Sequence, residues 1–134
     1  MYLVYQPEGS DEPRRFKYQP TKLMSAERER LEKLTGRDFS DFTHGVVRGN
    51  ALCRRALLFI LLKREHPTLK FDDVDFAWDE LTLEHSKAEL EEIRAEAADN
   101  APADQRAAVL AQLDKEIAEA YEEPEGKVLP PIAG

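Results

Sequence analysis

The stretch from Ala51 to Pro67, ALCRRALLFILLKREHP, is the most apolar part of the chain and decides the fold class. Its longest apolar run, Ala56 to Leu62, has seven residues, whereas a helix that crosses a bilayer needs about 20. Pro67 cannot continue a helix and also restricts the residue before it. The pattern therefore predicts a central core helix over residues 51–65, and we expect no membrane span.

Apolar residues recur at helical spacing on both sides of this core helix. Further helices are expected from Ser25, a candidate N-cap, to the stop at Gly36, and from Phe39 to the stop at Gly49. A short capped helix is predicted over residues 71–76. Two long helices, predicted over residues 82–98 and 103–122, are expected to form a helical hairpin.

The two ends of the chain have a different character. Two β-type runs, Tyr2–Gln6 and Arg14–Tyr18, are separated by seven turn-forming residues, which predicts a hairpin or arm that needs a docking surface. Prolines and glycines concentrate after residue 123. We therefore predict an N-terminal arm or hairpin (1–20), an all-α domain of about five to six helices (21–122) and a flexible tail (123–134).

The charge of the chain is unevenly distributed. The net charge is −8, and residues 1–70 hold 14 Lys/Arg against 9 Asp/Glu, whereas residues 71–134 hold 5 against 18. The acidic half would repel a phosphate backbone, and the basic residues form no dense cluster. We therefore expect no nucleic-acid partner. The single cysteine excludes an internal disulfide.

Residues that often carry chemistry lack the spacing that catalysis or metal binding requires. The three histidines are too far apart in sequence for a helical metal pair, and Cys53 lies in the apolar core helix, where an inert buried thiol is the usual outcome. Phosphate-binding loops and hydrolase motifs are absent from the sequence. We therefore expect no enzyme activity, no catalytic residue, no cofactor and no metal ion.

The acidic run from Asp72 to Glu80 superficially resembles a calcium loop. Counting from Asp73 places Ala77 at a ligand position and Trp78 where the turn requires glycine. The interpretation that remains is a solvated acidic segment. Its apolar residues are expected to contact the core: Phe71, Val74, Phe76 and Trp78.

The core helix is apolar on more than one side. At 100° per residue, Arg55, Leu58 and Leu62 lie within about 60° of one another. A different side carries Leu52, Ala56, Phe59 and Ile60. Either the domain's own helices cover both sides, or the side with Arg55, Leu58 and Leu62 binds a partner. We take these three residues as the candidate partner-binding site.

Four segments together resemble a known family: MSAERERLEKLTG (24–36), Ala51-Leu52, LLFILLKREHP (57–67) and LKFDDVDF (69–76). In order and spacing they are similar to the small tail assembly chaperones of phages with long non-contractile tails. The resemblance covers residues 22–80. Arg54 and Arg55 stand where smaller residues are expected, and the N-terminal arm lies outside the pattern.

The resemblance implies a mostly helical protein that binds the tape measure protein, a long helical apolar chain, and keeps it soluble during tail assembly. It also implies a tail tube partner through a frameshifted longer form, and a location in the cytoplasm of the infected bacterium rather than in the mature virion. The alternative is a small structural virion component, such as a head–tail connector or minor tail protein. The sequence leaves self-association open.

Overall fold

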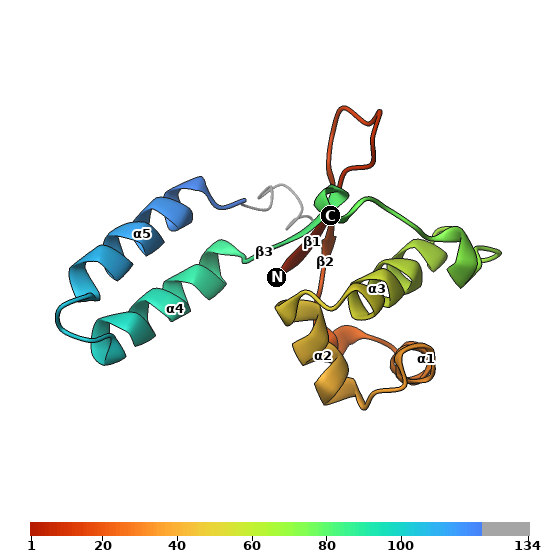
Figure 1. Cartoon of the computed structure of the whole chain (residues 1–134), viewed down its shortest axis with the longest axis horizontal. Coiled ribbons are helices and arrows are strands. Elements are labelled where there is room, and N and C mark those ends of the chain that lie inside the picture. The colour runs from red at the N-terminus through yellow and green to blue at the C-terminus, as the bar shows by residue number, and fades with distance from the viewer. Residues whose placement is uncertain (122–134) are drawn as a thin grey trace, which may run out of the picture. The chain divides into compact units, whose positions relative to one another are not determined.

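The computed structural model describes residues 1–121 and divides the chain into two compact units (Figure 1). The first unit comprises Tyr2–Leu83, and the second comprises Met1 and the chain from Glu84 onward. The residues of the predicted helical domain, 21–122, are therefore divided between two units. The predicted flexible tail, 123–134, lies outside the described residues. The described chain is mostly helical with a small β-sheet, so the all-α class was too narrow.

The predicted N-terminal hairpin is part of this sheet. Strand β1 (Tyr2–Tyr5) pairs antiparallel with β2 (Arg14–Lys17), with Tyr2 opposite Lys17. A third strand, β3 (Leu81–Glu84), lies on the other edge of β1, which gives the order β2-β1-β3. Leu3 and Leu81 are both buried. Strand β3 therefore supplies the docking surface that a two-stranded hairpin needs.

The prediction of a helix starting at Thr82 was wrong. Residues 81–84 form β3, and helix α4 (Lys87–Asn100) begins only after Ser86. The Ser86 hydroxyl accepts a hydrogen bond from the backbone N–H of Glu89 at 3.1 Å, and the Glu89 carboxylate accepts one from the N–H of Ser86 at 2.8 Å. This capping box fixes the start of the helix and leaves the preceding residues free to pair with β1.

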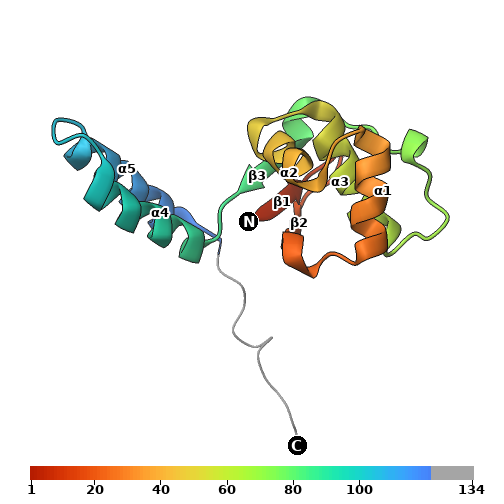
Figure 2. The same ribbon diagram turned by 90° about the horizontal axis from the view of Figure 1, so that it is seen from below.

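Three helices pack against one another in the first unit (Figure 2): α1 (Ser25–Thr35), α2 (Phe39–Arg48) and α3 (Ala51–Lys63). Helix α3 is the predicted core helix, and its start is fixed by Asn50, whose side chain accepts from the N–H of Cys53 at 3.0 Å. Short 3-10 turns complete the unit: η1 (Pro20–Lys22), η2 (Phe71–Asp73) and η3 (Trp78–Glu80). The predicted helix over 71–76 is thus only the turn η2.

A glycine allows α2 and α3 to approach closely. A Cβ atom at Gly45 would lie 2.5 Å from Sγ of Cys53, which is too close for any real contact. Cys53 is fully buried. Glycine in the middle of a helix lowers helix stability by about 1 kcal/mol relative to alanine. In this chain the close packing of α2 against α3 offsets that lower stability of α2.

The second unit contains the predicted helical hairpin. Helices α4 and α5 (Arg106–Glu119) run antiparallel side by side in both views (Figure 1, Figure 2). Leu90 and Leu113 are buried, and the Arg94 guanidinium pairs with the Asp114 carboxylate at 2.5 Å. Every helix within residues 1–121 is too short or too polar to cross a bilayer.

Candidate partner-binding surface

The three residues predicted to bind a partner lie in different environments. Leu58 is 0% exposed, whereas Arg55 and Leu62 are half-buried. Leu58 cannot touch a partner while the unit is folded, because α3 is packed against α1 and α2. Leu58 is therefore covered by the helices of its own unit, as one of the two sequence-based alternatives predicted. The three residues do not form one accessible surface.

Arg55 fastens a loop to the core helix. Its Nε donates a hydrogen bond to the backbone carbonyl of Val74 at 2.5 Å, and its Nη2 donates to that of Phe71 at 3.0 Å. The guanidinium also lies 4.1 Å from the centre of the Phe71 ring. These contacts hold η2 and the buried Val74 against α3. Arg55 thus positions the chain that leads to Trp78.

Arg54 hydrogen-bonds to the preceding helix, α2. Its Nε donates to the carbonyl of Val46 at 2.8 Å, and its Nη2 lies 3.5 Å from the carbonyl of Val47. These carbonyls belong to the last turn of α2, where the helix dipole favours cations. Burial lowers the pKa of the Arg54 guanidinium from its usual value. The guanidinium carbon of Arg54 lies 5.3 Å from the centre of the Trp78 ring.

The segment that follows Val74 presents one exposed aromatic side chain beside two half-buried ones. Trp78 is 49% exposed, and its ring stacks on Phe76 with centroids 6.4 Å apart and an interplanar angle of 22°. Tyr5 of β1 meets the Phe76 ring edge-on, also at 6.4 Å. We name Tyr5, Arg54, Phe76 and Trp78 the Trp78 surface. All four belong to the first unit.

The environment of Tyr5 favours the neutral form of its phenol. Partial burial, and to a smaller extent the nearby charge of Glu80, raises the pKa of the Tyr5 phenol. The Glu80 carboxylate also accepts from the backbone N–H of Glu8 at 2.7 Å and of Ala77 at 2.8 Å. Glu80 therefore ties the turn that carries Trp78 to the β-hairpin.

The composition of the Trp78 surface suits protein binding. Tryptophan, tyrosine and arginine are the residues most enriched at energetic centres of interfaces, since they combine a large apolar area with polar groups. A half-exposed indole fixed by Arg54 and Phe76 loses little side-chain freedom when a partner covers it. The Trp78 surface therefore has the composition that is common at protein-binding surfaces.

Comparison with protein-family models, curated proteins and solved structures finds no match to this chain.

Sequence reasoning missed the Trp78 surface because it assigned the aromatic residues of this segment to the core. Val74 is buried as expected, but Phe71 and Phe76 are half-buried and Trp78 is exposed. A partial signal was present in the sequence. Trp78 lies among several carboxylates, and tryptophan is enriched at the energetic centres of interfaces.

The remaining chemistry-bearing residues are dispersed. His44, His66 and His85 are exposed. Cys53 is fully buried, and burial raises the pKa of its thiol, as expected for an inert cysteine. Within residues 1–121, no three His, Cys, Asp or Glu side chains gather in a way that could hold a metal ion.

Proposed function

We propose that this chain is a phage tail assembly chaperone that binds the tape measure protein and keeps it soluble during tail assembly. The observation that carries the proposal is the Trp78 surface, where a half-exposed indole stacks on Phe76 and lies beside Arg54 on a small helical unit. The sequence resemblance over residues 22–80 supports it, because those residues form α1, α2, α3 and the Trp78 segment of a single compact unit.

The client that this surface binds in our proposal is a long, helical and apolar chain. A long amphipathic chain exposes more apolar area than soluble proteins tolerate, so it aggregates unless binders cover it. Trp78 and Phe76 offer apolar contact area to such a client. The charge of the second unit then keeps the complexes apart, since residues 84–121 hold four Lys/Arg against ten Asp/Glu, a net charge of −6.

The remaining parts of the proposal follow the same family resemblance. The chaperone acts in the cytoplasm of the infected bacterium and is absent from finished virions. A longer frameshifted form brings tail tube subunits to the coated client. These statements concern the life cycle of the complex, and each is open to direct test in infected cells.

The test is co-expression with the tape measure protein encoded just downstream. We expect the client to stay in the supernatant with the wild-type chain and to sediment without it. Trp78→Ser should reduce the soluble fraction, because it removes the largest apolar side chain of the Trp78 surface. Ile93→Ser is the matched control, since Ile93 is also an exposed apolar residue but lies on α4.

Two outcomes would contradict the proposal. One is a client that sediments equally with and without the chain. The other is the chain itself found in purified virions at the abundance of a structural subunit, which would favour the alternative of a head–tail connector or minor tail protein. Mass spectrometry of purified particles distinguishes these roles.

A further inference from the structure

A groove lies between α1 and the C-terminal end of α3. Its volume is about 260 Å³, and its lining consists of Ala26, Glu27, Arg30, Ile60, Lys63 and Arg64. All six residues belong to the first unit, and none of them is part of the Trp78 surface. Ala26 and Ile60 supply its apolar part, and the charged side chains surround them.

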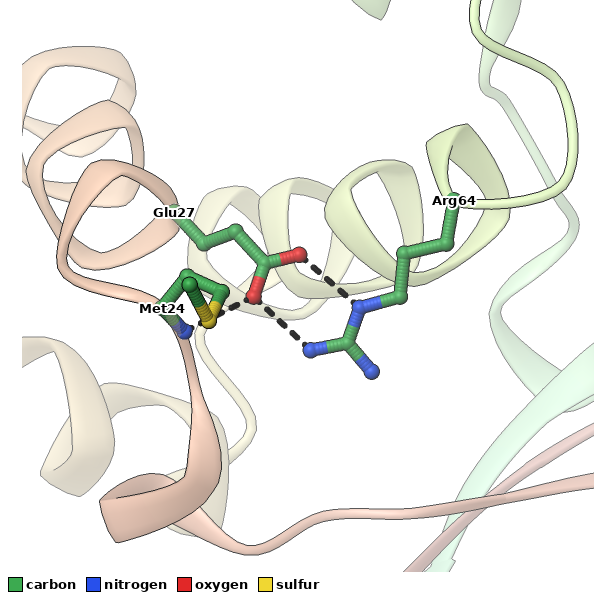
Figure 3. Close-up of polar contacts among 3 residues, drawn as sticks. All are labelled: Met24, Glu27 and Arg64. Carbon is green, nitrogen blue, oxygen red and sulfur yellow. Dashed lines mark hydrogen bonds and ion pairs between the residues drawn. The ribbon is translucent and has the colours of Figure 1, made fainter.

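The charges around the groove are predominantly positive. Glu27 is engaged by Arg64, whose Nε and Nη2 each donate to a carboxylate oxygen at 2.8 Å (Figure 3). This bidentate pair holds the pKa of Glu27 below its usual value. Arg30 and Lys63 have no carboxylate of the groove left to neutralise them, so the lining carries three cations against one anion.

The two excess cations are held near the groove by an aromatic ring. The guanidinium of Arg30 lies 5.5 Å from the centre of the buried Phe59 ring, and Nζ of Lys63 lies 5.6 Å from it. Lys63 also donates to the carbonyl of Pro67 at 2.7 Å. Both positive charges are therefore preorganised, which reduces the entropy lost when an anionic partner binds.

An adaptable apolar side chain stands next to the groove. Met24 precedes α1 and is 69% exposed. Its backbone N–H donates to the Glu27 carboxylate at 3.0 Å, so the residue is anchored beside the ion pair (Figure 3). Exposed methionines at binding surfaces adjust their shape to the partner. The apolar area near the groove is thus larger than the pocket alone.

We propose that this α1–α3 groove binds an acidic amphipathic helix of the tape measure protein. One large aliphatic side chain of that helix enters between Ala26 and Ile60, and its carboxylates face Arg30 and Lys63. The volume fits side chains rather than a drug-sized ligand, since small-molecule pockets span about 300–1,000 Å³. The inference rests on the proposed function, which supplies a long helical client, and charge complementarity selects its acidic segments.

The test uses the full chain and a synthetic probe. The probe is a labelled amphipathic peptide of about 18 residues, or five turns, with leucine on one face and glutamate and glutamine on the other. A counterpart carries lysine in place of glutamate. Fluorescence anisotropy should show binding of the glutamate peptide and not of the lysine peptide. Added salt should weaken the binding.

Matched variants locate the binding. Ala26→Glu and Arg30→Glu should each weaken it by about tenfold, since each places a repelling carboxylate in the groove. Ser25→Glu and Lys33→Glu make the same charge changes on α1 outside the lining and should stay within about twofold of wild type. All four positions are exposed helix sites that accept glutamate, and circular dichroism verifies the fold of each variant.

Three results would overturn the inference. The first is equal binding of the two peptides, and the second is an equal effect of Ala26→Glu and Ser25→Glu. The third is self-association of the free chain that Arg30→Glu abolishes, which would place the acidic helices of a second copy in the groove. If the chain keeps its client soluble but does not bind the glutamate peptide, the proposed role of the groove is wrong and the proposed function is unaffected.

Discussion

Replacement of Arg55 by methionine tests whether Arg55 stabilises the fold or binds a partner. Arg55→Met keeps most of the aliphatic stem and removes the guanidinium that bonds to the carbonyls of Phe71 and Val74. If Arg55 holds the 71–74 segment, its loss must destabilise the first unit. If it binds a partner, the fold should hardly change.

The contacts set the expected magnitude. Hydrogen bonds to a charged group contribute about 1.5–3 kcal/mol each when buried, and the stacking on Phe71 adds about 0.5–1 kcal/mol. Both hydrogen bonds are only partly buried, so water replaces part of what is lost. We therefore expect Arg55→Met to lower the free energy of unfolding by about 2–4 kcal/mol.

Urea unfolding followed by tryptophan fluorescence is the appropriate assay. Trp78 is the single tryptophan of the chain, and it lies four residues beyond Val74, so its emission reports the segment that Arg55 holds. The control is Arg48→Met on the exposed end of α2, for which we expect a loss of about 0.5 kcal/mol or less. An unfolding free energy equal to wild type, combined with weaker client binding, would refute the reasoning and restore Arg55 as a partner contact.

Two further predictions concern the packing and the ionisation of the first unit. Gly45→Ala should destabilise the wild-type chain by about 1–2 kcal/mol, because the new Cβ meets Sγ of Cys53. In a Cys53→Ala background the same change should be neutral or stabilising by up to about 1 kcal/mol. Chemical denaturation of the single and double variants measures this change of sign. If Gly45→Ala is equally destabilising in both backgrounds, the contact with Cys53 is not the cause. The second prediction concerns the ion pair between Glu27 and Arg64, which lowers the pKa of Glu27 in the folded chain. The pair therefore contributes its full stabilisation of the folded state above the unfolded pKa of 4.5, and this contribution is lost as the pH falls through the lower folded pKa. The stability difference between wild type and Glu27→Gln should thus be constant from pH 7 to about 5.5 and shrink below about 4.5, and a difference that instead grows toward acid pH would reject the assignment.

The helical part of the first unit was predictable because its signals are local. The apolar run of α3 is bounded by Asn50, whose side chain caps the helix, and by Pro67, and the stop of α1 at Gly36 has the left-handed backbone expected of a C-terminal glycine. Strand β3 was not predictable in the same way. Leu83 is in helical phase with Leu90, and only the distant β1 strand gives residues 81–84 a reason to be extended.

The candidate site escaped sequence reasoning for a similar reason. The sequence singled out the Arg54-Arg55 pair as unusual, but its hydrogen-bond acceptors lie outside α3, at the end of α2 and in the 71–74 segment, where helical periodicity cannot place them. Helical periodicity placed Arg55 and Leu58 on one side of α3, yet it could not show that tertiary packing buries Leu58 completely. Contacts between segments distant in sequence decide which apolar side remains exposed.

The fluorescence of Trp78 during titration with a short soluble helical segment of the tape measure protein, used as the client, tests the central claim most directly. With the client's own tryptophans replaced by phenylalanine, all emission comes from the Trp78 surface, where the indole is 49% exposed. If the chain binds its client through this surface, the emission shifts to shorter wavelength and becomes protected from acrylamide quenching as the client is added. Emission and quenching that stay unchanged at saturating client would contradict the account.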